Sequence, residues 1–322
     1  MLILRLVLFV AGFVLLVKGA DFLVGGASSI ARELRVSELV IGLTVVAFGT
    51  SVPELVVNVS ASVSGVTDIA IGNILGSSTA NILLILGIAA VIYPISVTRT
   101  TVWREIPLAV LAAVLVAVVA NDIFLDGSLL SFISRTDGIV LMLFFVIFVY
   151  YVLALIRGQR ARAQGKAPQK RGLLRPIVLV VIGAIGVNIG ARFVVDSAVF
   201  LADHLQVSQS LIALTAVAIG TSLPELVTAV TAAAKKNTDM AVGTVVGSNV
   251  FNVFCILGLS AIIRPIPLPL QANMDILVLL GASVLLFLAM FTGGKKHFLT
   301  AREGFVFVGL YVAYIVVLLL RR

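Results

Sequence analysis

Long apolar stretches separated by short polar breaks follow one another along the whole chain. A helix needs about 20 apolar residues to cross the ~30 Å hydrocarbon core of a bilayer. The stretches long enough are 2–30, 37–64, 68–93, 105–121, 137–156, 176–201, 208–234, 239–263, 274–292 and 303–320. This pattern predicts an all-α polytopic membrane protein with ten transmembrane helices.

Composition supports the same fold class. Hydrophobic residues make up 61% of the 322 positions and charged residues 12%, and the mean hydropathy is +1.20, which is too apolar for a soluble core. The first stretch lacks a signal-peptide cleavage pattern, so we predict that it is a span. The one cysteine, Cys255, lies in an apolar stretch and excludes an internal disulfide.

A repeated motif divides the chain into two halves. GTSVPEL at 49–55 returns as GTSLPEL at 220–226, and residues 44–61 match residues 215–232 at 12 of 18 positions. A second pair of segments, 68–87 and 239–258, repeats Gly, Ser and Asn at the same 171-residue offset. Both halves therefore carry the same two-part motif.

The basic segment 157–175 separates five predicted spans from five others. Because five is odd, the second half must enter the membrane from the opposite side. We therefore predict two inverted five-helix repeats, 1–156 and 176–322, joined by this linker. Inverted repeats are typical of secondary transporters that bind their substrate near the midplane.

The net charge of +8 does not indicate a nucleic-acid partner, because the Lys and Arg residues lie in alternate loops. With the amino terminus outside, sixteen of them fall on the inner side and five on the outer side. This asymmetry predicts a multi-pass protein of the cell membrane whose central basic loop is cytoplasmic. Tyr93, Trp103, Tyr150 and Tyr151 fit an aromatic belt at the interfaces.

Each copy of the motif places one acid, Glu54 or Glu225, inside an apolar span. A buried carboxylate in a bilayer is costly unless it is protonated, paired or bound to a cation. Pro53 and Pro224 cannot donate a backbone hydrogen bond, so we expect the helix to open around Gly49 and Gly220. The freed carbonyls must line a wet cavity or be buried in protein.

Further oxygen-bearing residues lie at helical spacing around these acids. Ala47, Thr50, Ser51 and Glu54 form one stripe, as do Ala218, Thr221, Ser222 and Glu225, and Ser77–Asn81 and Ser248–Asn252 are i, i+4 pairs. Oxygen ligands without nitrogen or sulfur favour hard cations, and Ca²⁺ suits six to eight of them. By contrast, Asp68 and Asp239 begin their spans and are predicted helix caps.

Two other interpretations of the acids remain open at this stage. The pair could share a proton and only lock the halves together, although a duplicated intramembrane acid usually marks a functional site. An intramembrane enzyme is disfavoured, because neither His204 nor His297 is placed to activate a serine and no HExxH motif occurs. We expect no cofactor and no obligate protein partner.

On these motifs the chain resembles the cation/calcium exchanger superfamily, and within it the prokaryotic sodium/calcium exchangers. The resemblance covers the full length and implies that Glu54 and Glu225 are the central Ca²⁺ ligands. It further implies oxygen ligands for Ca²⁺ and Na⁺ from Thr50, Ser51, Thr221, Ser222, Ala47, Ala218, Ser77 and Ser248, with Asn81 and Asn252 flanking the centre. Some members have aspartate at one of the asparagine positions, whereas this chain has two site carboxylates only.

The resemblance implies antiport of Ca²⁺ against Na⁺ by alternating access at a midplane site. The alternatives are H⁺/Ca²⁺ exchange on the same fold, a dependence on K⁺, and a cation channel, whose filter would more naturally be a ring of carbonyls or acids. The transported ions and the lipid bilayer are the expected partners.

Overall fold

The computed structural model describes residues 2–123, 127, 130–162, 172–204, 220–269, 271–292 and 297–320. Nearly all ordered elements are helical, and four of them are π-helical segments, labelled η. The helical elements of the first half are α1 (Leu2–Leu34), α2 (Glu38–Ile41), η1 (Gly42–Val46), α3 (Ala47–Thr50), α4 (Val52–Ser64), α5 (Thr67–Ala80), η2 (Asn81–Ile85), α6 (Leu86–Ile92), η3 (Thr101–Glu105), α7 (Ile106–Val119) and α9 (Arg135–Arg162).

The second half contains fewer described helical elements. Its elements are α10 (Leu174–His204), α12 (Leu223–Ala234), α13 (Thr238–Val250), η4 (Phe251–Leu257), α14 (Gly258–Ile263), α15 (Ala272–Thr292) and α16 (Ala301–Leu320). Helix α9 continues six residues into the segment predicted as linker, because its Arg and Gln residues are good helix formers.

The count of spans differs from the predicted ten. Eight helices within the described residues are long and apolar enough to cross a membrane, and the bent pair Glu38–Thr50 and Val52–Ser64 gives a ninth. The predicted span 208–234 lies partly outside the described residues, and the described part, Leu223–Ala234, is too short to cross alone. The structure is therefore a mostly helical polytopic membrane protein with eight or nine candidate spans.

The all-α prediction missed two short antiparallel ladders. Strand β1 (Ile95–Ser96) pairs with β4 (Phe298–Leu299), and β2 (Phe132–Ile133) pairs with β3 (Ile266–Pro267). Strand β1 follows α6, and its partner β4 precedes α16, the last helix of the other half. In the same way β3 follows α14, and its partner β2 precedes α9, the last helix of the first half. Two-residue strands are too short to show an alternating pattern, so sequence periodicity could not reveal them.

The buried centre is formed by the two helices that carry the second part of the motif. In the most apolar 18-residue stretch of the spans Thr67–Ile92 and Thr238–Ile263, 78% of the residues are buried. In the corresponding stretch of Arg135–Ala161 in α9, 17% are buried. Residues such as Leu143, Val146 and Ile147 of α9 are more than half exposed. Exposed apolar surface of this extent fits a hydrocarbon solvent rather than water.

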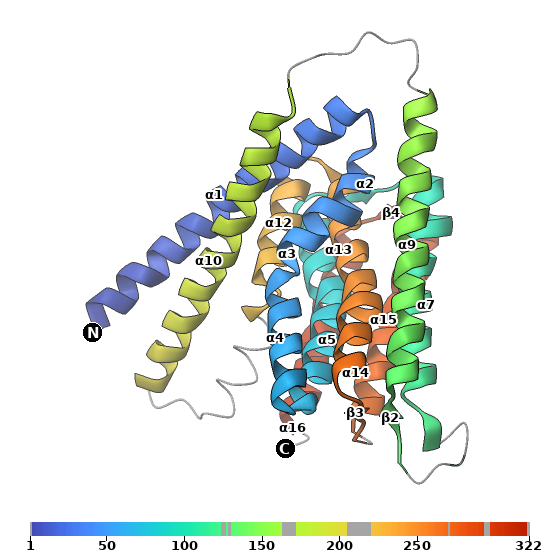
Figure 1. Cartoon of the computed structure of the whole chain (residues 1–322). Coiled ribbons are helices and arrows are strands. Elements are labelled where there is room, and N and C mark those ends of the chain that lie inside the picture. The colour runs from blue at the N-terminus through green and yellow to red at the C-terminus, as the bar shows by residue number, and fades with distance from the viewer. Residues whose placement is uncertain are drawn as a thin grey trace.

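Glycines allow close crossings that are reciprocal between the halves. Gly87 of α6 lies against Gly304 of α16, and Gly258 of α14 lies against Gly138 of α9. Helices α1 and α10 cross in the same reciprocal way, Gly12 against Gly190 and Gly19 against Gly183. Figure 1 shows α1 and α10 side by side and tilted, beside the upright bundle of the other helices.

Each half has a Gly-x-x-x-Gly pair, a spacing that permits close helix approach, but only the second pair makes one: an added Cβ would meet nothing within 4 Å at Gly72 or Gly76. Gly243 lies against the backbone of Leu39 and Leu43, and Gly247 lies against Leu43 and Ala47. This approach brings α13 directly onto the broken helix of the first half. The functional motif of one half is thus placed against that of the other.

A substitution on α16 tests the close crossing. A Cβ added at Gly304 would lie 2.6 Å from the Gly87 carbonyl oxygen, whereas one added at Gly309 would meet nothing within 4 Å. We expect Gly304→Ala to lower the free energy of unfolding by about 1–3 kcal/mol. The matched Gly309→Ala should leave it unchanged or slightly raise it. Thermal unfolding in detergent measures both, and equal melting temperatures would contradict this packing.

Candidate ion-binding site

Two broken helices carry the repeated motif. The helix of the first half ends at Thr50 and restarts at Val52 with a 49° bend, and Ser51 between them has φ −86° and ψ 10°. Ser222 has nearly the same conformation, φ −87° and ψ 0°, just before α12. Each proline then falls in the first turn of the new helix, where its missing N–H costs nothing.

The predicted opening of the first helix is confirmed, with one refinement. The break is centred on Ser51, so the stripe Ala47, Thr50, Ser51 and Glu54 is divided between α3 and α4 and does not lie on one continuous helix. Glu54 and Glu225 lie in the first turns of α4 and α12, where the helix dipole favours a negative charge.

The two glutamates meet in the interior. Each is 1% exposed, and they are close enough for their charges to repel each other. One oxygen of Glu225 accepts a hydrogen bond from the Ser51 hydroxyl at 2.8 Å, and Oε2 of both glutamates has no hydrogen-bond partner among the described residues. Two buried carboxylates with free oxygens need a positive ion or protons between them.

Hydroxyl groups from the opposite half surround this pair. Ser51 contacts Ser248 at 3.1 Å, so the broken helix of the first half meets α13 of the second. Thr221 in turn lies 3.4 Å from Ser77 and donates to Asn73 at 3.1 Å. The contacts are approximately reciprocal, and we call this set with Glu54 and Glu225 the glutamate cluster.

The remaining predicted residues that the structure describes are buried, and Ala218 is the one that it does not describe. Thr50 is fully buried, and its hydroxyl donates to the carbonyls of Val46 and Ala47 at 3.1 and 3.2 Å. Ser222 and Asn252 are buried, and each has a side-chain oxygen to which no described residue donates a hydrogen bond.

Asn81 joins the two buried helices. Its amide donates to Asn249 at 2.9 Å, and the Asn249 amide donates to the Ser78 carbonyl at 3.1 Å. Oδ1 of Asn81 has no hydrogen-bond partner within the described ranges. Asn81 and Asn252 begin or nearly begin the π-helical segments η2 and η4, and such segments recur at functional sites.

Sequence comparison of the halves missed three asparagines of this network. Asn73 and Asn249 each lie one helical turn or less from a repeated serine, but the positions 171 residues away are Thr244 and Ser78. Asn188 on α10 corresponds to Val17. A search for repeated residues cannot find groups that only one half contains. The sequence signal that could have identified these residues is an asparagine within an otherwise apolar predicted helix.

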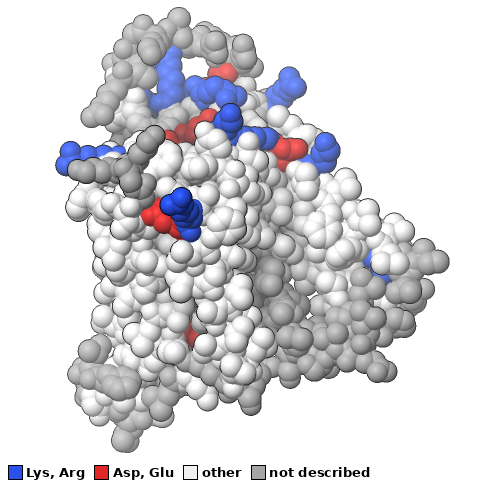
Figure 2. All heavy atoms as spheres, turned by 180° about the vertical axis from the view of Figure 1, so that it is seen from behind, with Lys and Arg blue, Asp and Glu red and all other residues white. Residues whose placement is uncertain are grey.

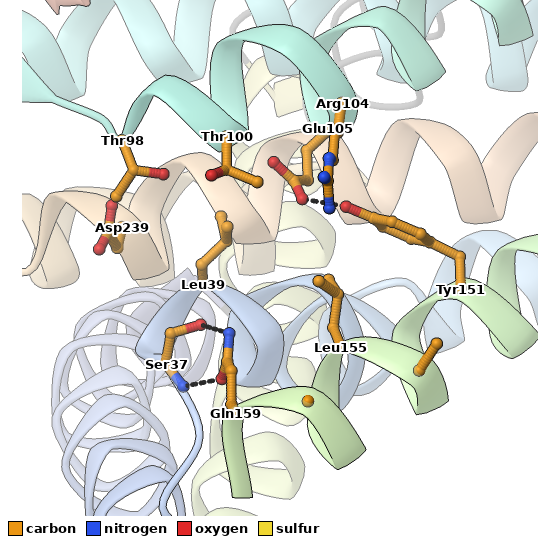
Figure 3. Close-up of a pocket in the computed structure, with 12 residues that line it drawn as sticks. Ser37, Leu39, Thr98, Thr100, Arg104, Glu105, Tyr151, Leu155, Gln159 and Asp239 are labelled. Atoms are coloured by element: carbon orange, nitrogen blue, oxygen red, sulfur yellow. Dashed lines mark hydrogen bonds between the residues drawn. The ribbon is translucent and has the colours of Figure 1, made fainter. Parts of the chain in front are cut away.

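A separate polar cavity of about 540 Å³ lies between α2, η3, α9 and α13 (Figure 3). Glu105 is 1% exposed there and accepts a hydrogen bond from Tyr151, so Tyr151 is more than a residue of the aromatic belt. Asp239 lines this cavity and is not the predicted cap, because Asn237 caps α13. Val66 likewise precedes α5 in place of Asp68. The side chain of Arg104 also lines this cavity, so the cavity contains a basic group, whereas the glutamate cluster contains none.

The donor set of the glutamate cluster suits a hard cation. It offers two carboxylates, hydroxyls, amide oxygens and backbone carbonyls, and the two charges match those of a divalent ion. No group of three or more His, Cys, Asp or Glu side chains gathers among the described residues, so neutral oxygens would have to complete any coordination shell.

Comparison with known proteins gives a consistent result. The family model described as "Sodium/calcium exchanger protein" matches residues 4–154 and 175–320. The chain belongs to the sodium/calcium exchanger family. Inner membrane protein YrbG of Escherichia coli is 39% identical, with 88% of each chain covered. Sodium/calcium exchanger MaX1 of Methanosarcina acetivorans is 33% identical, with 99% of each covered.

Solved structures agree with this membership. The sodium-calcium exchanger NCX_Mj superimposes with a TM-score of 0.84 at 34% identity, covering 99% of this chain and 100% of that one. The predicted place in the cation/calcium exchanger superfamily is thereby confirmed. The relatives are exchangers and antiporters, so the prediction that the chain is not an enzyme and uses no cofactor holds as well.

If the glutamate cluster binds cations, added Ca²⁺ should raise the stability of the folded protein. A ligand that binds only the folded state at 100 times its Kd stabilises by about 2.7 kcal/mol. We expect added Ca²⁺ to raise the unfolding temperature of the native chain in detergent containing no other divalent ion. Glu54→Gln and Glu225→Gln should remove most of this rise, because each deletes one charged ligand.

The control is Glu33→Gln, which changes an acid of α1 outside the cluster and should keep the full rise. An undiminished rise in both cluster variants would contradict ion binding at Glu54 and Glu225.

Proposed function

We propose that the chain is a secondary antiporter that exchanges Ca²⁺ for Na⁺ by alternating access at the glutamate cluster. One observation supports the proposal: two carboxylates, one from each half, are buried in the same polar cluster, and each has an oxygen without a hydrogen-bond partner among the described residues. Ca²⁺ or several Na⁺ would neutralise the same two charges. The ions therefore compete for one site, and that competition couples their fluxes.

The proposed ligands are the residues that line this pair. Glu54 and Glu225 supply the charge, Ser51, Thr221, Ser77 and Ser248 supply hydroxyls, and Thr50, Ser222, Ala47 and Ala218 contribute further hydroxyl or carbonyl oxygens. Asn81 and Asn252 flank the centre. The names of relatives favour Na⁺ as the second ion, since MaX1 and NCX_Mj are both called sodium/calcium exchangers.

We also propose that the halves 1–156 and 176–322 are inverted five-helix repeats joined by the basic segment 157–175. Reciprocal contacts support this arrangement, among them Gly12–Gly190 with Gly19–Gly183, and Gly87–Gly304 with Gly258–Gly138. The segment around 208–234 would supply the tenth span. An inverted pair of broken helices would meet at the membrane midplane.

The proposed orientation places the amino terminus outside and the basic loop in the cytoplasm. Figure 2 shows most of the visible Lys and Arg residues toward one end of the molecule, with one basic patch apart from them at the side. In Figure 1 the carboxyl end of α9 and the start of α10 lie at that end, and both termini lie toward the other. Positive charge retained on the cytoplasmic side would account for this separation.

Exchange of H⁺ for Ca²⁺ is the second candidate. The unpartnered carboxylate oxygens would accept protons as well as sodium, and a relative from Alkalimonas amylolytica, 37% identical over 94% of this chain, is named only a putative antiporter, CaxA. The coupling ion must therefore be separated by experiment.

Calcium flux in proteoliposomes, with Na⁺, H⁺ and K⁺ gradients imposed one at a time, tests the proposal. We expect an outward Na⁺ gradient to drive Ca²⁺ uptake, and either Glu54→Gln or Glu225→Gln to abolish it. If three or more Na⁺ move per Ca²⁺, uptake should respond to voltage by about 2.3 kcal/mol per charge per 100 mV.

Asp68→Asn is the matched control, because Asp68 lies in the first turn of α5 outside the cluster. Uptake driven by a pH gradient without Na⁺ would select H⁺ coupling. Uptake indifferent to every gradient would overturn antiport.

A further inference from the structure

The break in the first broken helix leaves one backbone acceptor without its normal partner. In an uninterrupted helix the Gly49 carbonyl would accept from the N–H of residue 53. Residue 53 is proline and has no N–H. The Asn188 side chain of α10 takes that place, and its Nδ2 donates to the Gly49 oxygen at 3.1 Å.

Asn188 is an amide in an otherwise apolar stretch of α10. The same Nδ2 also donates to the Ala184 carbonyl one turn earlier at 2.7 Å. Its Oδ1 is buried and has no partner in the part of the chain that the structure describes. A polar side chain at membrane depth is costly unless its hydrogen bonds compensate, so the bond to Gly49 gives Asn188 a specific role.

This bond adds a polar link to the apolar contacts between the pair α1–α10 and the bundle, where Leu223 and Val227 of α12 pack against the pair. Helices α1 and α10 share a small cluster of their own, Leu16, Ala20, Val187, Ala191 and Val194, distinct from the main core. Further polar links between this helix pair and the bundle lie at the basic end, where Asn237 contacts Ser28, Ser28 contacts Glu38 and Lys235 contacts Asp21. Asn188 instead reaches the residue two before the break at Ser51.

The contact is present in one half only. The residue 171 positions before Asn188 is Val17, which has no side-chain donor. The duplication therefore does not explain Asn188 as a shared packing residue. An amide found on α10 alone makes the two halves unequal, and unequal halves give two access states of unequal free energy.

We propose that Asn188 is a positioning residue that holds α10 against the broken helix through the Gly49 carbonyl in the arrangement described here. The bond must break when the pair α1–α10 and the bundle move relative to each other. Asn188 thereby sets the balance between the two access states without binding the ion. This inference rests on the proposed alternating-access function.

The test compares Asn188→Leu and Asn188→Asp with the native chain. Leucine is close in size and removes both polar atoms. Aspartate keeps the shape, and above the pKa of its carboxyl group it lacks the donor and carries a negative charge that repels the Gly49 carbonyl, so this variant is measured as a function of pH. The apparent affinity for Ca²⁺ is measured from each face, in right-side-out and inverted vesicles, together with Ca²⁺ binding in detergent. Ser197→Ala, a buried serine on the same helix, is the control.

We expect the ratio of the two apparent affinities to change about two- to tenfold in both variants, the net effect of one hydrogen bond. The Ser197→Ala ratio should equal the native one. At acidic pH the carboxyl group introduced by Asn188→Asp becomes protonated and regains a donor. The ratio of that variant should then return toward the native value, while that of Asn188→Leu should not.

An unchanged ratio in both variants, with native flux intact, overturns the inference. A fall in unfolding temperature and in turnover at a constant ratio also overturns it, because that outcome is purely structural. If Asn188→Leu fails to fold, Asn188→Asp alone decides the matter. Absence of ion-driven flux in the native chain would instead refute the proposed function.

Discussion

The repulsion between two buried carboxylates is the constraint on which the rest of the structure depends. Glu54 and Glu225 are both buried inside an apolar bundle, each with one oxygen that has no partner among the described residues. Such a pair is unfavourable unless a cation or protons accompany it. Under the proposed function, this cost would disfavour the site without its ions.

The surrounding architecture allows this pair to exist. The broken helices deliver the two acids at helix starts, where the dipole offsets part of the charge. The glycines of α13 bring it onto the first broken helix, so that Ser248 reaches Ser51. The short ladders and the reciprocal glycine crossings then hold the third helix of each half against the last helix of the other.

The polar network is less symmetric than the motif. Asn73 and Asn249 occupy positions that differ between the halves, and Asn188 reaches Gly49 without a counterpart in α1. A perfectly symmetric transporter would have two access states of equal free energy. Residues found in one half only can bias that balance while the duplicated residues keep the chemistry of the ion site.

The sequence by itself determined the membrane class, the duplication, the acids Glu54 and Glu225, and the opening of the helix at Pro53, because apolar periodicity, repeat spacing and proline geometry are local properties. Only the tertiary structure decided which neutral groups meet those acids. Helix crossings create the long-range contacts of Asn73 and Asn188 and the cavity at Glu105 and Tyr151. The partners of Asn73 and Asn188 in these contacts lie more than a hundred positions away in the chain. The strand ladders and the role of Asp239 likewise arise from packing between the halves, which no single helix encodes.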